Sequence, residues 1–182
     1  MLAITVDGSL ADWNGRTSAT LTAAQAEYLR PAATPAAANL SSRLWTACSG
    51  DYMLIAGIIT DTAIYSPGDF PLYVGDSAEV QIDGLADGIV RPGQDDHDVF
   101  IGQNSTIKDY GIPMVATVIA RTTPSSNWRY EVAIPLSELW GTLGAGSEIS
   151  TTLSLYDRDT STPTPPASAD RVMVGPSWRW NW

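Results

Sequence analysis

Short segments rich in β-branched and aromatic residues recur along most of this chain, and turn-forming residues separate them. The clearest is 76–83, where Ala78, Val80 and Ile82 alternate with polar residues. A period of two is typical of a strand with one face on a core and the other on solvent or ligand. Further strands are predicted at 3–6, 44–48, 52–60, 97–101, 114–121, 128–134, 149–156 and 172–174. About nine short strands favour an all-β, antiparallel two-sheet sandwich of the jelly-roll or immunoglobulin-like kind.

The segment at 52–60 differs from the other predicted strands because residues 53–59 are apolar at almost every position. Such a run is typical of a central strand covered on both faces. Ser49, Gly50 and Asp51 precede it, and turn-forming residues at this place predict a hairpin with the strand at 44–48.

Residues 1–182 are predicted to form one domain, since this length suits a single core and no linker or internal repeat divides the chain. Helix is expected only as two turns at 23–29 and one turn at 135–139. Trp13, Trp45 and Trp128 are predicted core residues.

The formal net charge of -10 disfavours binding to nucleic acid or to an anionic membrane. No apolar run is long enough to insert into a bilayer, and the first residues lack the basic start and apolar region of a signal peptide. The excess of carboxylates either keeps the protein soluble or suits a hard cation, calcium above all.

Catalysis is not expected. The chain has one histidine, His97, and one cysteine, Cys48, which leave few groups for a nucleophilic mechanism. His97 lies among acids and is interpreted as ion-paired or calcium-adjacent, and Cys48 as a small buried residue. Glu79 and Glu131 are strand carboxylates that face one another in one hypothesis, as a glycosidase pair requires, although no feature marks either as an acid.

Five segments carry motifs in an order and at spacings that resemble one known family. They are ITVDGSLADW at 4–13, GDSAEVQID at 75–83, DDHDVF at 95–100, YEVAIPLSEL at 130–139 and LSLYDRD at 153–159. This pattern resembles the family 9 carbohydrate-binding modules over nearly the whole chain. The resemblance implies a β-sandwich without catalytic activity, structural calcium, and a slot in which two aromatic side chains hold the end of a glycan.

The resemblance implies that Tyr73 and Trp178 form this slot. Arg179, Trp180 and Gln81 are the further candidates for carbohydrate binding. Aromatic rings stack on the apolar faces of a pyranose, and a few polar groups hold its hydroxyls. Alternate spacing places Trp178, Trp180 and Trp182 on one side if the tail is extended, where they form either a ligand platform or an anchor against the core or a partner.

Acidic residues in two neighbouring segments are the candidate calcium ligands. They are Asp83, Asp87, Asp95, Asp96 and Asp98. Calcium takes 6–8 oxygens, often from several loops. Asp-Gly pairs at 83–84 and 87–88 are equally typical of ordinary turns, so both interpretations stay open.

A second function suits the same sandwich, namely a structural display or decoration protein on a phage particle or another surface assembly. Its partners would be capsid or other assembly subunits, whereas those of a carbohydrate-binding module would be glycans or polysaccharides. The expected location is extracellular or on a virion surface. A fold of this kind serves both functions, so the fold does not decide between them.

Overall fold

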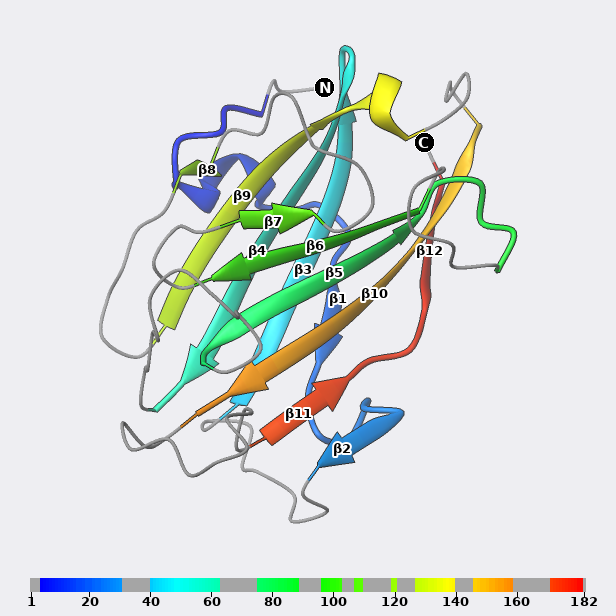
Figure 1. The fold of residues 1–182 in the computed structure, drawn as a ribbon. Helices are drawn as coiled ribbons and strands as arrows, with labels where there is room; N and C mark the ends of the chain where they lie inside the picture. Colours follow the sequence, from blue (N-terminus) through cyan, green and yellow to red (C-terminus); the bar gives the residue numbers. More distant parts are fainter. Residues whose placement is uncertain are drawn as a thin grey trace.

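The computed structural model describes residues 4–30, 40–62, 75–88, 96–102, 107–109, 119–120, 127–139, 146–158 and 171–181. These residues form two antiparallel sheets that lie face to face (Figure 1). The all-β sandwich predicted from the sequence is confirmed. The prediction of one domain over 1–182 stays a prediction.

The first sheet has the order β1-β3-β4-β9-β8. Its strands are β1 (Ala19–Leu21), β3 (Leu40–Ser49), β4 (Tyr52–Asp61), β8 (Ile119–Ala120) and β9 (Asn127–Pro135). The predicted hairpin joins β3 to β4, and Gly50 adopts a positive φ of 59° at its turn. β4 lies between β3 and β9, and residues 53–57 are buried on both faces, which confirms the central strand.

The second sheet has the order β2-β11-β10-β5-β6-β7, and β12 also pairs with β10. Its strands are β2 (Tyr28–Arg30), β5 (Ser77–Asp83), β6 (Asp96–Gly102), β7 (Ile107–Asp109), β10 (Glu148–Asp157), β11 (Arg171–Val174) and β12 (Trp178–Asn181). Figure 1 shows β11 and β12 following β10 in turn along one edge. The C-terminal tail is therefore extended, which is the condition under which the spacing places its tryptophans on one side.

The main core lies between the two sheets. Its largest side chains include Trp128 and Tyr130 from β9, and the alternating residues Ala78, Val80 and Ile82 of β5 are at most 1% exposed. Gly57 of β4 lies opposite Tyr130 in the register, and a Cβ there would come within 2.3 Å of the Tyr130 ring. Only glycine leaves this tyrosine room to lie across β4.

A second, smaller core covers the outer face of the first sheet. Trp13, at the end of the 3-10 turn η1 (Leu10–Trp13), packs there against Trp45 and Leu54, with Ile4 and Val6 at its margin. Trp13, Trp45 and Trp128 are 1%, 6% and 0% exposed, so all three predicted core tryptophans are confirmed.

Several local predictions are wrong. Residues 4–6 are not a strand, because they lie along the second core outside any sheet. Residues 23–27 form a turn that leads into β2, since pairing with β11 replaces the predicted helix. Cys48 is exposed, because it lies near the end of β3 where the hairpin extends beyond the core.

Other predictions hold in part. A single 3-10 turn, η3 (Leu136–Glu138), follows β9 as expected. Of the strand predicted at 114–121, only β8 falls within the described residues. Among those residues, no helix has the length and apolar character needed to cross a membrane.

Candidate functional site

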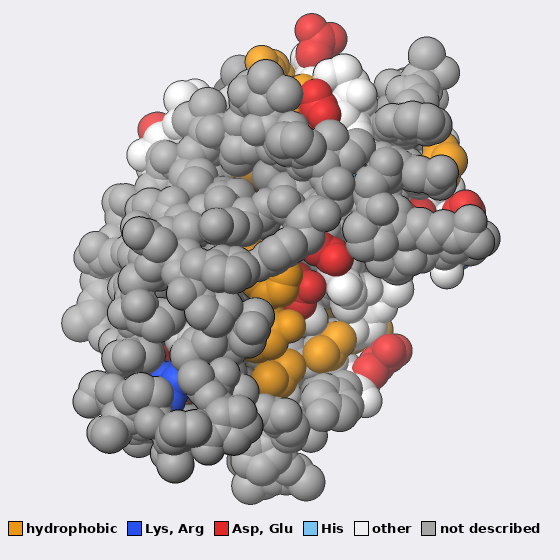
Figure 2. All heavy atoms as spheres, in the orientation of Figure 1, with side chains coloured by type: hydrophobic (Ala, Val, Ile, Leu, Met, Phe, Trp, Pro, Cys, Tyr) orange, Lys and Arg blue, Asp and Glu red, His pale blue; other side chains and the backbone are white. Residues whose placement is uncertain are grey.

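The outer face of the second sheet carries the polar half of the β5 alternation. Strand pairing places three rows side by side across β10, β5 and β6. They are Ser154–Glu79–Phe100, Thr152–Gln81–Asp98 and Ser150–Asp83–Asp96. Figure 2 shows hydrophobic side chains in line over the strands of this sheet, with acidic side chains beside them. This combination of rings and hydrogen-bonding groups suits recognition of a polar ligand.

Glu79 is buried on this face, and its residue is only 7% exposed. The Tyr156 hydroxyl donates a hydrogen bond to Glu79 Oε2 at 2.8 Å. Within the described part of the chain this is the only hydrogen bond of the carboxylate, so Oε1 has no donor. Burial raises the pKa of Glu79, the Tyr156 hydrogen bond opposes that shift, and the nearby charge of Asp98 adds to it.

An aromatic pair lies beside Glu79. The rings of Phe100 and Tyr156 have centroids 5.8 Å apart and are tilted by 33°. Phe100 is buried, whereas Tyr156 is half-buried and keeps part of its ring accessible. Burial and the neighbouring Glu79 raise the pKa of Tyr156, so its hydroxyl stays protonated and donates to the carboxylate.

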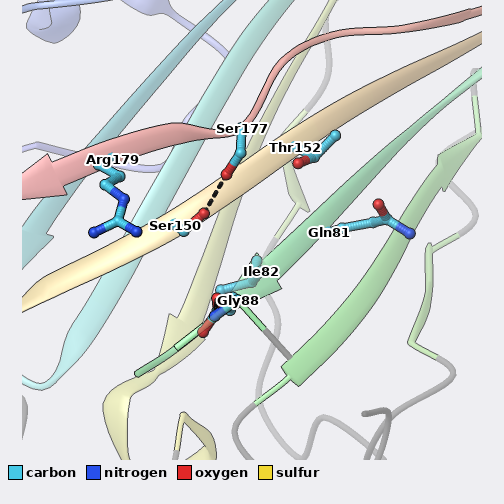
Figure 3. A pocket seen from close by; sticks show the side chains of 8 residues that line it. Gln81, Ile82, Gly88, Ser150, Thr152, Ser177 and Arg179 are labelled. Atoms are coloured by element: carbon cyan, nitrogen blue, oxygen red, sulfur yellow. Dashed lines mark hydrogen bonds between the residues drawn. The ribbon is translucent and has the colours of Figure 1, made fainter. Parts of the chain in front are cut away.

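A cleft of about 410 Å³ opens at the next two rows and extends toward the C-terminal tail. Its lining residues are Gln81, Ile82, Asp83, Gly88, Ser150, Thr152, Ser177 and Arg179 (Figure 3). The hydroxyls of Ser150 and Ser177 are hydrogen-bonded to each other. Among the described residues, neither Gln81 nor Thr152 has a side-chain hydrogen bond, so both can serve a ligand.

Two of the five predicted carbohydrate-binding residues lie in this cleft. Gln81 reaches it from β5, and Arg179 reaches it from β12, where its guanidinium is 2.5 Å from Glu148 Oε1. Trp178 and Trp180 lie on the opposite side of β12, half-buried against the main core, and Trp180 Nε1 donates to Thr151 Oγ1 at 2.8 Å.

Tyr73 and Trp182 lie outside the described residues. The slot between Tyr73 and Trp178 therefore stays a prediction. Sequence reasoning missed Phe100 and Tyr156 because two strands far apart in sequence bring them together. Glu79 carried a signal, since the alternation of 76–83 directs it to the polar, outer side of the sheet.

Three buried carboxylates form a separate cluster at one end of the space between the sheets. Asp61 ends β4, Asp76 precedes β5 and Asp157 ends β10, and the three are 1%, 3% and 0% exposed. One oxygen from each lies within 4.8 Å of the other two. The backbone N–H of Arg158 donates to Asp76 Oδ1 at 2.7 Å. Oxygen donors from both sheets converge here, which fits the coordination chemistry of a hard cation such as calcium.

The calcium ligands predicted from sequence are arranged differently. Asp83 and Asp96 face each other across β5 and β6, and Asp98 lies one row along. The Asp83 carboxylate accepts the backbone N–H groups of residues 87 and 88 at 3.1 and 2.9 Å, so it organises its own turn. Asp87 is exposed, and Asp95 lies outside the described residues.

His97 and Glu131, the other residues that the sequence offered as candidates for chemistry, are each held by hydrogen-bonding partners within the fold. His97 is 1% exposed, and its Nε2 lies 2.9 Å from the Glu138 carbonyl oxygen. Glu131 is on the outer face of the first sheet, where its carboxylate accepts hydrogen bonds from Trp13 Nε1 and from the backbone N–H groups of Asp7 and Gly8. Glu79 and Glu131 thus lie on opposite outer faces of the sandwich and do not form a glycosidase pair.

Comparison with solved structures identifies the fold. A family 9 carbohydrate-binding module from Caldicellulosiruptor kristjanssonii, solved in complex with cellotriose, superimposes with a TM-score of 0.74 at 14% identity, covering 95% of this chain and 80% of that one. The structure of a family 9 module from the same organism in complex with glucose has the same TM-score and identity. No family model matches this sequence, and no curated protein matches it. The chain therefore has the fold of the family 9 modules, at a sequence identity that reports on fold alone.

Proposed function

We propose that this protein is a non-catalytic carbohydrate-binding module whose ligand lies on the outer face of the second sheet. The observation that carries the proposal is Glu79, a buried carboxylate that opens on this face with one oxygen lacking a donor. An ionised carboxylate oxygen at the edge of a buried side chain can accept a charge-assisted hydrogen bond from a sugar hydroxyl. The similarity to two sugar-bound modules of the same fold supports this choice of ligand.

The neighbouring groups complete the chemistry that a sugar requires. The accessible part of the Tyr156 ring offers a face for the C–H groups of a pyranose, while Gln81 and Thr152 offer hydrogen bonds to its hydroxyls. The hydroxyls give up water on binding, so we expect affinity in the micromolar to millimolar range, corresponding to about -8 to -4 kcal/mol.

Calorimetric titration with cello-oligosaccharides tests this function. Tyr156→Ala removes both the ring face and the donor to Glu79, and we expect binding to weaken at least about tenfold, since stacking and a hydrogen bond together contribute more than roughly 1.4 kcal/mol. Tyr52→Ala is the matched control, because Tyr52 is 42% exposed at the start of β4 on the other sheet. Equal loss in both variants, or none in either, contradicts the proposal, as does a failure of the natural protein to bind any glycan.

We also propose that calcium stabilises the fold, held by Asp61, Asp76 and Asp157. A bound cation would compensate three buried carboxylates and link the two sheets at one end. An ion present at 100 times its dissociation constant stabilises the folded state by about 2.7 kcal/mol. For a chain of this size that corresponds to a rise in melting temperature of roughly 5–10 °C.

Melting curves with chelator and with added calcium test this site. We expect chelator to lower the melting temperature and calcium to restore it, and Asp76→Asn to abolish the response. Asp51→Asn is the control, since Asp51 is an exposed acid in the β3–β4 turn. A melting temperature that neither chelator nor calcium changes would contradict the calcium site, because protein groups alone would then compensate these acids. A response that is lost in Asp98→Asn would return the site to the acids of β5 and β6.

An extracellular location agrees with this function. The alternative, a decoration protein on a phage particle or other assembly, draws on the packing of Trp178 and Trp180 against the core, which suits the interpretation of the tail as an anchor. It predicts that the protein is recovered attached to capsid or other assembly subunits, with no measurable affinity for glycans.

A further inference from the structure

Groups that can contact a sugar lie in line along the outer face of the second sheet. Glu79, Gln81 and Asp83 follow one another on the same side of β5, and each is paired with a serine or threonine of β10. A strand rises about 3.3 Å per residue, so the Cα atoms of Glu79 and Asp83 are about 13 Å apart. This distance is longer than a single pyranose ring, so one sugar unit does not contact both ends of the line.

The two ends of this line differ in chemistry. At one end, the Tyr156 ring lies beside Glu79 and packs against Phe100, so it offers a face on which a sugar stacks. At the other end is the cleft of about 410 Å³, within the range of roughly 300–1,000 Å³ typical of ligand sites. Its described lining includes no aromatic side chain (Figure 3). A sugar unit in the cleft would therefore be held mainly by hydrogen bonds.

The cleft has the hydrogen-bonding groups to hold such a unit. One hydroxyl of the Ser150–Ser177 pair donates to the other, so the pair keeps one further donor and free lone pairs. Arg179 has five N–H groups, of which one donates to Glu148, and its side chain is 64% exposed. Among the described residues its side chain makes no other hydrogen bond, so its remaining donors are accessible from the cleft that it lines.

The row of Gln81 and Thr152 connects the two ends. The two residues are paired across β5 and β10, and their row lies between that of Glu79 and that of Asp83. A glycan that lies along the strands would contact the Tyr156 ring, then this row and then the cleft. Because the three rows lie in line, such a chain must be extended. A chain of the cellulose type is extended, whereas a chain of the amylose type, built of the same glucose units, is coiled.

We propose that this face binds extended glycans along their length, over at least two consecutive sugar units, one stacked on Tyr156 and the next held in the cleft by Arg179 and the Ser150–Ser177 pair. The inference rests on the proposed function, because it takes the outer face of the second sheet to be the carbohydrate site. It differs from recognition of a glycan end in a slot. Here the second unit adds contacts of its own, and the shape of the chain decides whether that unit reaches the cleft.

Calorimetric titration with glucose, cellobiose and cellotetraose tests the length of the site, and maltotetraose tests the preference for an extended chain. We expect cellobiose and cellotetraose to bind at least about tenfold tighter than glucose, because the unit in the cleft adds at least two hydrogen bonds. Maltotetraose has the same composition as cellotetraose, and we expect it to bind at least about tenfold more weakly.

Two arginine variants locate the second unit. Arg179→Ala removes donors of the cleft, so it should lower the affinity for cellotetraose about three- to tenfold and leave that for glucose unchanged. Arg43→Ala is the matched control, because Arg43 is exposed on β3 of the other sheet, and it should change neither affinity. Tyr156→Ala should weaken the binding of both sugars, since the first unit stacks on this ring.

The outcomes separate this inference from the proposed function. Equal affinity for glucose and cellotetraose that Tyr156→Ala still weakens overturns the inference and leaves the function intact, as does equal affinity for the two tetrasaccharides. An Arg179→Ala variant that loses no affinity for cellotetraose, or loses no more than Arg43→Ala does, also overturns the inference, because the second unit then lies elsewhere. If none of the sugars binds, the proposed function and the inference both fail.

Discussion

The two outer faces of the sandwich each hold a buried glutamate, and they use it in opposite ways. On the first sheet, Glu131 is 0% exposed and accepts three hydrogen bonds that tie residues 7–13 onto the strands. On the second sheet, Glu79 is 7% exposed and accepts one hydrogen bond from the part of the chain that the structure describes, that of Tyr156. Both carboxylates are buried. What distinguishes the structural Glu131 from Glu79, the proposed binding residue, is the number of donors that the described residues supply.

The surroundings of each glutamate follow from the same difference. Trp13, Trp45 and Leu54 cover the outer face of the first sheet, so the protein itself occupies the position that a ligand would take. The matching positions on β5 and β10 are polar, and Gln81 and Thr152 have no hydrogen bonds from the described residues. One face is completed within the chain, and the other has unused hydrogen-bonding capacity.

The largest expected difference between the faces is in stability. Glu131→Ala removes the acceptor of two buried donors and one partly buried donor. A buried donor left unsatisfied costs about 1–3 kcal/mol, so we expect a loss of roughly 3–5 kcal/mol. Glu79→Ala removes one bond from a half-buried tyrosine that water can replace, and we expect less than about 1.5 kcal/mol. Urea unfolding of the two variants measures both values, and similar losses would remove the distinction between the two glutamates.

A smaller difference is expected from apolar contacts on the same two faces. Leu54 is 4% exposed beneath Trp13, so Leu54→Ala should cost about 2–4 kcal/mol by leaving a cavity. Thr152→Ala on the outer face of the second sheet should change stability by no more than about 0.5 kcal/mol. Thermal unfolding of this pair sharpens the comparison, and a Thr152→Ala cost equal to that of Leu54→Ala would mean that the second face is also a packed one.

The smallest effect concerns pH. Burial raises the pKa of Glu79, with Asp98 adding to the shift and Tyr156 opposing it, so the folded protein holds this proton more tightly than the unfolded chain does. Stability relative to Glu79→Gln should therefore rise as the pH falls from neutral through the raised pKa toward the ordinary value of 4.5. Unfolding free energies of both proteins across this range give the difference in stability. A difference that stays constant, or that decreases as the pH is lowered, would contradict the assignment.

Alternation along 76–83 predicted both β5 and the face on which Glu79 lies, because the period of two depends only on local geometry. The strand at 52–60 was predictable from its continuous apolar run, and those at 128–134 and 149–156 from local composition and the turn residues between them. The part played by Glu131 was not, since its partners lie 118 to 124 residues away. Asp61, Asp76 and Asp157 likewise meet only because two sheets close on each other.

The C-terminal tail shows a further limit of local patterns. The spacing of Trp178 and Trp180 predicted that both rings share one side of an extended strand, and the register of β12 on β10 confirms it. Which side they share depends on the pairing partner. Thr151 lies opposite Trp178 and faces the core, so both rings pack inward and Arg179 points to the cleft.

The central claim is that the outer face of the second sheet binds carbohydrate, and NMR titration of the isotope-labelled protein with a cello-oligosaccharide tests it most directly. We predict that backbone amide signals shift in β5, β6 and β10 and around residues 177–179, while those of β3, β4 and residues 7–13 stay in place. Shifts confined to the first sheet or to residues 7–13, or no shifts at millimolar sugar, would contradict the account.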